Sequence, residues 1–281
     1  MTEARWTLVV DDQGVTIASD RFQFRTNGSP AALTGHQDDE AVLGAVESSQ
    51  MEAIVSELQT MTKRTYGQFC GLARALEIIG ERWAMLIIRD LLVSPKSVAD
   101  LYWGLPRIPT EVLCARLNEF EHMGVVQQSA TPRPDGSVVY ELTDWGRELD
   151  DITLRLGLWG TKILGEPRPE DIVTADSLVM ALRTTFRPEA AKGVKVSYQL
   201  RFDDIVIHAQ IKNGAIRAAE GTLEGADLVI EPGGELKSLM TGAATAAEVL
   251  ANGSVRVTGD PALLTLFTDL FQIPFRAESR N

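Results

Sequence analysis

The sequence predicts an α+β protein with two folded domains behind a short N-terminal extension. Three observations support this. Helical patterns with a single hairpin fill the middle of the chain, the Gly- and Pro-rich stretch GEPRP interrupts it at residues 165–169, and alternating strand patterns follow. We therefore expect an extension at 1–60, a first domain at 61–165 and a second at 166–281. A chain of 281 residues is long enough for two buried cores.

The N-terminal extension reads as a hairpin followed by a helix. Residues 5–26 alternate around the turn Asp11-Asp12-Gln13-Gly14, which predicts a β-hairpin. A helical apolar stripe then covers residues 39–61 and could either dock within the chain or join two protomers. Residues 1–60 match no family that we can name, so they could be a lineage-specific extension or result from an upstream start assignment.

The middle of the chain contains helices on both sides of one hairpin. Helical spacing covers residues 70–92 with a break near Gly80, then 97–104, and then 110–123 before Gly124. Two strands, 125–130 and 137–142, flank the turn Arg133-Pro134-Asp135-Gly136, and a long helix covers 144–164. This order of elements is that of a winged helix-turn-helix, in which one helix enters the major groove and the hairpin reaches the neighbouring backbone.

Residues 66–160 also resemble a known family. The stretches CGLARALEIIGERWAMLIIRDLL, GLPRIPTEVLCARLNEFEHMGVV and VVYELTDWGRELDDITLRLGLWG are similar to the HxlR-type branch of winged-helix bacterial transcription regulators. Members of that family are homodimers that bind DNA, so the resemblance implies a homodimer on a double-stranded, two-fold symmetric operator. The helix over 144–164 would then connect the protomers through Leu149, Ile152, Leu156 and Trp159, and the helix over 39–61 is a second candidate for this contact.

A helical wheel of residues 110–123 separates a core side from a groove side. Leu113, Leu117 and Phe120 share the core side, whereas Thr110, Glu111, Cys114 and Asn118 lie opposite. Several candidates have ordinary alternatives: Arg116 could form an ion pair, Glu111 could stabilise the helix N-terminus, and Thr110 and Asn118 could be solvated surface. The candidate DNA-contacting residues are Lys96, Arg107, Thr110, Glu111, Arg116, Asn118 and Arg133.

The two cysteines are too few for a disulfide framework. Cys70 begins the first helix of the resembling segment, and related HxlR-type regulators include thiol-based sensors with a cysteine at this place. A helix N-terminus favours the reactive thiolate, so Cys70 is a candidate redox sensor; the alternative is a semi-buried structural cysteine. Cys114, on the groove side of the wheel, is a second candidate.

The last third of the chain predicts a sheet covered by helices. Strands are expected at 194–202, 205–212, 215–219, 227–231 and 254–258, and helices at 176–185, 233–241, 245–252 and 261–271. The run ADLVIEPGGELKSLMTGAATAAEVLANGSVRVTGDPALLTLFTDLF resembles the sterol carrier protein type 2-like domain, which implies an α/β fold with a tunnel for fatty-acyl or sterol-like ligands. The domain would then serve as an effector sensor or a dimerisation module.

The resemblance to a carrier domain points to a set of apolar side chains that could line a ligand pocket. Each of them could instead fill an ordinary core. The candidates are Phe186, Leu239, Met240, Leu250, Leu263, Leu264, Phe267 and Phe271.

The net charge of −12 excludes a chain whose whole surface attracts nucleic acid. The charge is uneven, however. Residues 1–60 carry 3 basic and 10 acidic side chains, a net −7, whereas residues 61–133 carry 9 and 7, a net +2. Contacts to phosphate are therefore expected in the winged helix.

The sequence contains no motif typical of an enzyme, a metal site or a membrane protein. No nucleophile elbow, zinc-protease motif, phosphate loop or CxxC pair is present, and the three histidines are far apart. We therefore expect no enzyme and no metal or cofactor. No apolar run approaches ~18 residues and no signal peptide is evident, which predicts a cytoplasmic protein with no membrane partner. The rival hypothesis is a hydrophobe-binding carrier whose winged helix serves protein contacts.

Overall fold

The structure is a computed structural model that describes residues 6–11, 14–19, 23–26, 65–130, 133, 136–165 and 168–274. The chain divides into two units, Met1–Arg64 and Thr65–Asn281. The first contains an antiparallel sheet of β1 (Trp6–Asp11), β2 (Gly14–Ser19) and β3 (Gln23–Thr26). Asp11 pairs with Gly14, which confirms the predicted hairpin, and the third strand is an addition. The helix predicted over 39–61 lies outside the described residues. The boundaries predicted after residues 60 and 165 stay predictions.

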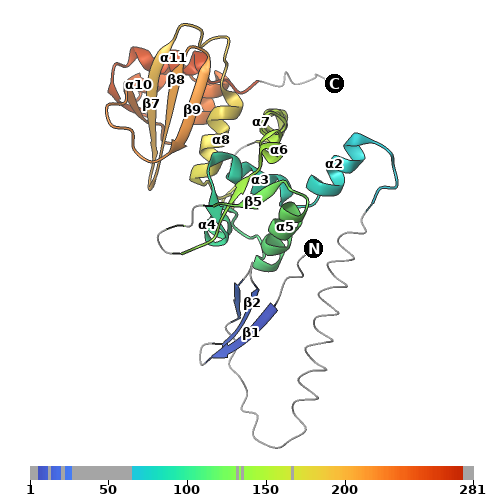
Figure 1. Ribbon diagram of the computed structural model, residues 1–281. Helices are drawn as coiled ribbons and strands as arrows, with labels where there is room; N and C mark the ends of the chain where they lie inside the picture. Colours follow the sequence, from blue (N-terminus) through green and yellow to red (C-terminus); the bar gives the residue numbers. More distant parts are fainter. Residues whose placement is uncertain are drawn as a thin grey trace, which may run out of the picture. The chain divides into compact units, whose positions relative to one another are not determined.

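Four helices open the second unit and form the core of the helix-turn-helix (Figure 1). They are α2 (Gly71–Ile79), α3 (Ala84–Val93), α4 (Val98–Gly104) and α5 (Thr110–His122). The predicted break between the first two is present, with Gly80 closing α2. Leu113, Leu117 and Phe120 on α5 are fully buried, as the wheel predicted.

The wing is a three-stranded sheet rather than a simple hairpin. Its order is β4 (Lys96–Ser97), β6 (Val139–Leu142) and β5 (Val126–Gln128), all antiparallel. The strand β4 was not predicted, because two residues are too few to show a period. Lys96, expected at the start of the third helix, instead pairs with Tyr140 in this sheet.

The closing helix is interrupted near its start. The single helix predicted over 144–164 is observed as α6 (Asp144–Arg147), α7 (Leu149–Gly160) and a final 3₁₀ turn, η1 (Thr161–Ile163). Thr143 caps α6 by accepting a hydrogen bond from Gly146 N at 3.0 Å. Gly146 is buried, and a Cβ placed on it would lie 2.1 Å from the carbonyl oxygen of Val125. This glycine therefore lets α6 pass directly over the start of the wing.

The C-terminal part is a five-stranded mixed sheet with helices. The strand order is β11 (Arg256–Gly259), β10 (Leu228–Glu231), β7 (Lys195–Phe202), β8 (Ile205–Lys212) and β9 (Ala215–Glu220), and only β10 and β7 run parallel. Apolar side chains on alternate positions of β7 and β8 are buried beneath the helices. These helices are α8 (Ala175–Thr185), α9 (Leu236–Thr241), α10 (Ala246–Ala251) and α11 (Ala262–Leu270).

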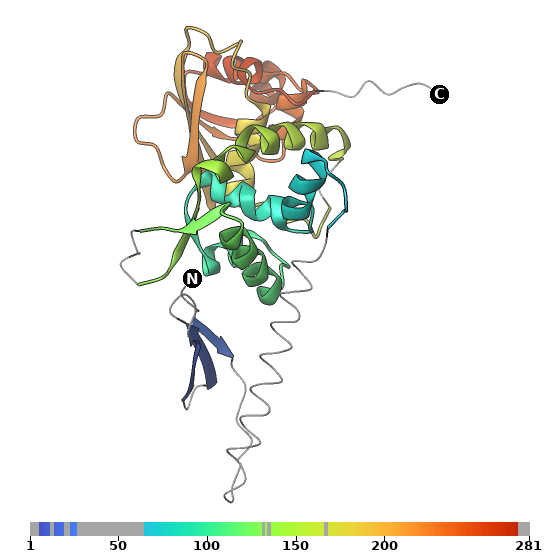
Figure 2. The ribbon, with the colours of Figure 1, turned by 45° about the vertical axis from the view of Figure 1, so that its right-hand side comes forward.

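The helix α8 connects the sheet to the helix-turn-helix. It packs against β8 and β9 on one side and against α3 and α7 on the other, and both ribbon views show it between them (Figures 1 and 2). Residues 65–281 therefore form one compact unit. None of the helices in the described ranges is long and apolar enough to cross a bilayer.

Two helical glycines should respond in opposite ways to an added methyl group. Gly146→Ala should destabilise the protein by about 2 kcal/mol, because its Cβ collides with backbone that cannot turn away. Gly160→Ala should be neutral or stabilise by up to about 1 kcal/mol, since nothing lies within 4 Å of the new Cβ and α7 gains helix propensity. Urea unfolding of both variants measures the difference. Equal effects would contradict this description of α6.

Candidate nucleic-acid interface

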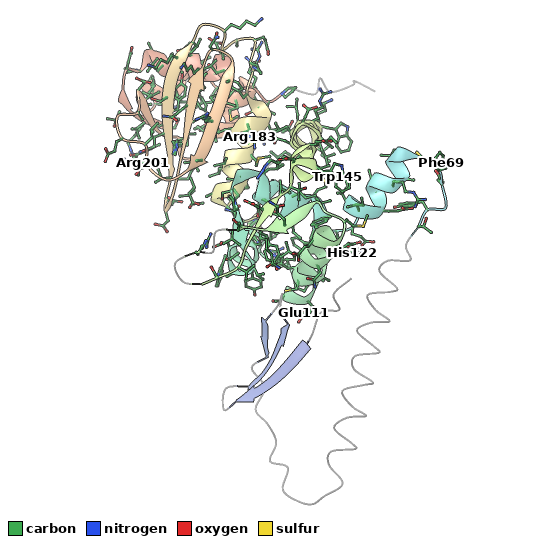
Figure 3. All side chains as sticks on the ribbon, in the orientation of Figure 1. Phe69, Glu111, His122, Trp145, Arg183 and Arg201 are labelled. Carbon is green, nitrogen blue, oxygen red and sulfur yellow. The ribbon has the colours of Figure 1, made fainter. Side chains whose placement is uncertain are left out.

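The N-terminal turn of α5 is exposed. Pro109 precedes the helix in an extended conformation, and Thr110 and Glu111 are exposed in its first turn, at the end that Figure 3 marks with Glu111. Arg107 is exposed just before the helix, with a positive φ of 77° that is unusual for a residue with a side chain. Its Nη2 donates to the carbonyl oxygen of Glu170 at 2.9 Å. One cation, one hydroxyl and one carboxylate thus flank the start of α5.

Arg133 is held beside the helix-turn-helix by an ion pair. Its Nη2 lies 2.7 Å from Oδ2 of Asp100, and its side chain is 39% exposed. Asp100 also accepts hydrogen bonds from the backbone and side chain of Ser97 in the capping box of α4. Burial acts to raise the pKa of Asp100, but the hydrogen bonds from Arg133 and Ser97 outweigh it and lower the pKa below its ordinary value. Asp100 therefore fixes the arginine in place at neutral pH.

On α5, Cys114 lies deeper than the wheel predicted, whereas Arg116 forms the ion pair named as its alternative. Cys114 is buried at 8% exposure, so its predicted place on the exposed side of α5 is wrong; α5 packs against strand β5 of the wing, which widens its buried arc. Burial and the nearby Glu111 charge raise the pKa of its thiol. Arg116 is also buried and forms an ion pair with Glu119. Asn118 is half-buried, and its Oδ1 finds no hydrogen-bond partner among the described residues.

Lys96 belongs to a buried charge cluster between the wing and α8. Its Nζ donates to Oδ1 of Asp176 at 2.9 Å, and both side chains are about nine-tenths buried. Asp90 on α3 lies beside this pair, fully buried, and accepts from Arg89 Nε at 2.7 Å, while its second oxygen is unpaired among the described residues. Burial raises the pKa of Asp90 to about 6, against the charges of Arg89 and Lys96, and Asp176 adds to the rise.

The predicted pocket residues separate into two groups. A cavity of about 550 Å³ lies among α9, α10 and α11, and Leu239 and Met240 line it together with Thr241, Thr265 and Thr268. Phe186 lines a different cavity, beside α7 and α8. The remaining candidates pack in or against the core of the sheet; they are Leu250, Leu263, Leu264, Phe267 and Phe271.

The comparisons with known proteins match the two halves of the second unit separately. A model of the HxlR-like helix-turn-helix family matches residues 78–167, and a model of the alkyl sulfatase C-terminal domain matches residues 172–276. The uncharacterized HTH-type transcriptional regulator YvaP of Bacillus subtilis is 33% identical over 89 residues, which cover 32% of this chain and 82% of that protein. The chain belongs to the HxlR-like helix-turn-helix family.

Other relatives of this HxlR-like protein agree with the assignment. The HTH-type transcriptional regulator YodB of Bacillus subtilis is 31% identical over 85 residues, covering 30% of this chain and 76% of that protein. The solved structure of reduced YodB shares 26% identity, covers 36% of this chain and all of that chain, and has a TM-score of 0.31. The family model and the curated relatives make the chain a transcriptional regulator with a DNA-binding helix-turn-helix. From its sequence, the C-terminal part resembles a sterol carrier protein type 2-like domain. The family model that matches residues 172–276 is instead that of the alkyl sulfatase C-terminal domain.

Sequence reasoning missed the acidic partners that hold the basic candidates. Asp100 could have been found, since Ser97 and Asp100 have the spacing of a capping box. Asp176 could not, because no local pattern joins residues 80 positions apart. Among the described residues, no group of three or more His, Cys, Asp or Glu side chains is placed to hold a metal ion.

The buried carboxyl of Asp90 should make the stability of this HxlR-like regulator fall as pH rises. Its folded pKa of about 6 lies above the ordinary 3.8, so the folded state binds the proton more tightly. The stabilisation is complete below about pH 4 and is lost as pH rises through about 6. Relative to Asp90→Asn, the wild type should lose up to about 3 kcal/mol between pH 4 and pH 7.

Chemical unfolding at several pH values measures this difference. Asp204→Asn, in the exposed turn between β7 and β8, is the matched control. A pH-independent difference for Asp90→Asn would show that folding leaves the pKa of Asp90 unchanged.

Proposed function

We propose that the protein regulates transcription in the cytoplasm as a homodimer on a two-fold symmetric operator, and that an apolar small molecule bound by its C-terminal domain, residues 166–281, modulates this binding. The observation that carries the DNA-binding part is the exposed first turn of α5, which Arg107 precedes, together with Arg133 beside α4. In a helix-turn-helix, the N-terminal residues of the second helix meet base edges in the major groove.

The burial of the side chains narrows the set of proposed DNA contacts. Thr110 and Glu111 are exposed where base edges would lie, and a carboxylate can accept a hydrogen bond from a cytosine amine. Arg107 and Arg133 would meet phosphates. Lys96 and Arg116 are engaged in buried ion pairs, so they support the fold around the site rather than reach the groove. Asn118 is intermediate between the exposed and the buried candidates, because it is half-buried and its amide oxygen is shielded from solvent.

The homodimer part rests on an apolar row along α7 and the turn η1 that follows it. Ile152, Leu156, Trp159 and Ile163 follow one another at helical spacing and are 51%, 50%, 63% and 71% exposed. Leu72 on α2 adds a further apolar side chain at 67% exposure. Contiguous exposed apolar patches are uncommon on monomers and mark protein interfaces. A second copy of this chain fits such a row, because a two-fold interface uses the same surface on both subunits.

The effector part rests on the cavity of about 550 Å³ among α9, α10 and α11. Its volume lies within the usual range of ligand pockets, and Leu239, Met240 and Ile273 supply apolar wall. The threonine hydroxyls at its margin can orient a ligand. In this proposal the domain binds without catalysis.

A response to thiol oxidation is a second candidate, favoured by the exposure of Cys70 at the N-terminal end of α2. Hydrogen peroxide should change operator affinity at least about threefold in the wild type and in Cys114→Ser, but not in Cys70→Ser, because only the exposed thiol meets the oxidant. Gel shifts with reduced and oxidised protein measure this. An equal response of all three proteins would remove Cys70 as the sensor.

Operator binding should depend on Arg133 and on salt. With an operator selected from a random DNA library, Arg133→Ala should weaken binding about tenfold and reduce the slope of log affinity against log salt by about 1, because one phosphate contact is lost. Fluorescence anisotropy over a series of salt concentrations measures both. Arg201→Ala, exposed on the C-terminal sheet (Figure 3), is the control and should change neither. No selectable operator, or binding independent of salt, would favour the rival carrier hypothesis.

The row on α7 should set the oligomeric state. Leu156→Glu should convert the dimer to a monomer, because it places a charge within the apolar contact. Light scattering after size exclusion measures the mass, and Thr258→Glu, exposed on β11, is the charge-matched control. A dimer that survives Leu156→Glu must use another surface.

A further inference from the structure

A second cavity lies where the two family-matched segments meet. It has a volume of about 320 Å³, is open to solvent on one side, and is lined by α7 from the HxlR-like segment, and by α8, the residues that follow α8 and the start of β9 from the C-terminal segment. We call it the seam cavity. Ligand sites occur preferentially at such domain junctions, and this volume is at the lower end of their usual range. Its lining residues are Leu154, Arg155, Leu158, Arg183, Thr184, Phe186, Pro188, Gly214 and Ile216.

The lining of the seam cavity combines apolar walls with positive charge. Leu154, Leu158, Phe186 and Ile216 give it an apolar body, and among the described residues that line it the ionisable ones are two arginines. Arginine guanidinium groups recognise carboxylate and sulfate geometry through paired hydrogen bonds. This combination suits a ligand that is apolar over most of its length and anionic at one end.

Arg183 keeps donor capacity for such an anion. Its Nη2 donates to both carboxylate oxygens of Asp150, at 2.8 and 2.6 Å, which fixes the side chain in place (Figure 3 labels Arg183). Its Nη1 donates to the thioether sulfur of Met180 at 3.3 Å. A thioether is a weak acceptor, so an anionic oxygen at Nη1 would be a clear gain. The side chain is 20% exposed, which limits competition from water.

Arg155 can reach the same ligand at little cost. Its ion pair with Asp151 joins two side chains that are 79% and 71% exposed, and ion pairs at that exposure contribute little to stability. Releasing it to an anion in the cavity therefore loses almost nothing.

We propose that the seam cavity binds a small amphipathic anion, with its apolar body between α7 and Ile216 and its anionic group at Arg183 and Arg155. The site is separate from the cavity among α9, α10 and α11. Its regulatory part rests on the proposed function, because α7 also carries the row proposed to join the protomers.

The close packing of α7 on α8 would pass ligand binding to that row. A Cβ on Gly157 would lie 3.2 Å from Oγ1 and 3.3 Å from Cγ2 of Thr184, so the two helices touch at this glycine. Leu154 and Leu158 face the seam cavity, while Leu156 and Trp159 on the same turns are exposed. A ligand that shifts α7 against α8 therefore moves the exposed row directly.

Binding of octanoate tests the site independently of DNA. We expect isothermal titration calorimetry on the full chain to show octanoate binding about tenfold tighter than 1-octanol, because only the carboxylate uses the arginines. Octylammonium should bind no better than the alcohol. Arg155→Gln should weaken octanoate about tenfold and leave 1-octanol unchanged; this exposed position leaves the fold intact, and Arg201→Gln is the matched control with no effect.

Two cavity-filling variants locate the ligand. Ile216→Trp should abolish octanoate binding, whereas Thr268→Trp, in the cavity among α9, α10 and α11, should preserve it. The reverse pattern, or octanoate binding no tighter than 1-octanol, would overturn the proposal. If the protein binds its operator but not octanoate, the seam site alone is overturned. If it binds octanoate but no operator, the proposed function alone is overturned.

Discussion

The arrangement of the second unit depends on one buried ion pair, between Lys96 and Asp176. The lysine lies on β4, the short strand that completes the wing, and the aspartate lies in the first turn of α8. Burying one of these charges without the other would be strongly unfavourable, so the wing and α8 are tied in a fixed relation. Asp90 adds a third buried charge to this region. Burial disfavours the charge of Asp90, and the neighbouring Arg89 balances it. The second ion pair, Arg183 with Asp150, fixes the far end of α8 to the beginning of α7.

A helix fastened at both ends gives the two halves of the unit a common element. α8 packs on the sheet through its buried side chains and on α3 and α7 through the opposite side. The winged helix is therefore packed directly against α8 and is not joined to the sheet by a flexible linker alone. Any change in the sheet that displaces α8 acts on the wing through Asp176 and on α7 through Arg183. In the proposed function, this packing is the route by which a molecule bound in the C-terminal half would act on the DNA-binding surface.

Local pattern predicted most of the fold, and its failures have local causes. The helices and strands of both halves follow periodicity, capping residues and turn residues, which act within a few positions of each other. The interruption between α6 and α7 was missed because Glu148 continues the helical pattern. Cys114 was misplaced because a wheel treats a helix as packed on one side, whereas the wing adds a second neighbour. The roles of Lys96 and Arg116 depend on which acid folds next to them. For Lys96 that acid lies 80 residues away, so its burial could not be read from the chain.

The hydrogen bond from Arg107 to the carbonyl oxygen of Glu170 restricts which substitutions this protein can tolerate at the two positions. The acceptor belongs to the main chain, so any residue at position 170 preserves it. The donor is a side chain on backbone of positive φ. A shorter side chain cannot reach the carbonyl oxygen of Glu170, and an apolar one has no hydrogen to donate. Variation should therefore be tolerated on the C-terminal side of this junction and restricted on the DNA-binding side. Relatives of this protein could therefore vary at position 170 while keeping the entrance to α5 in place.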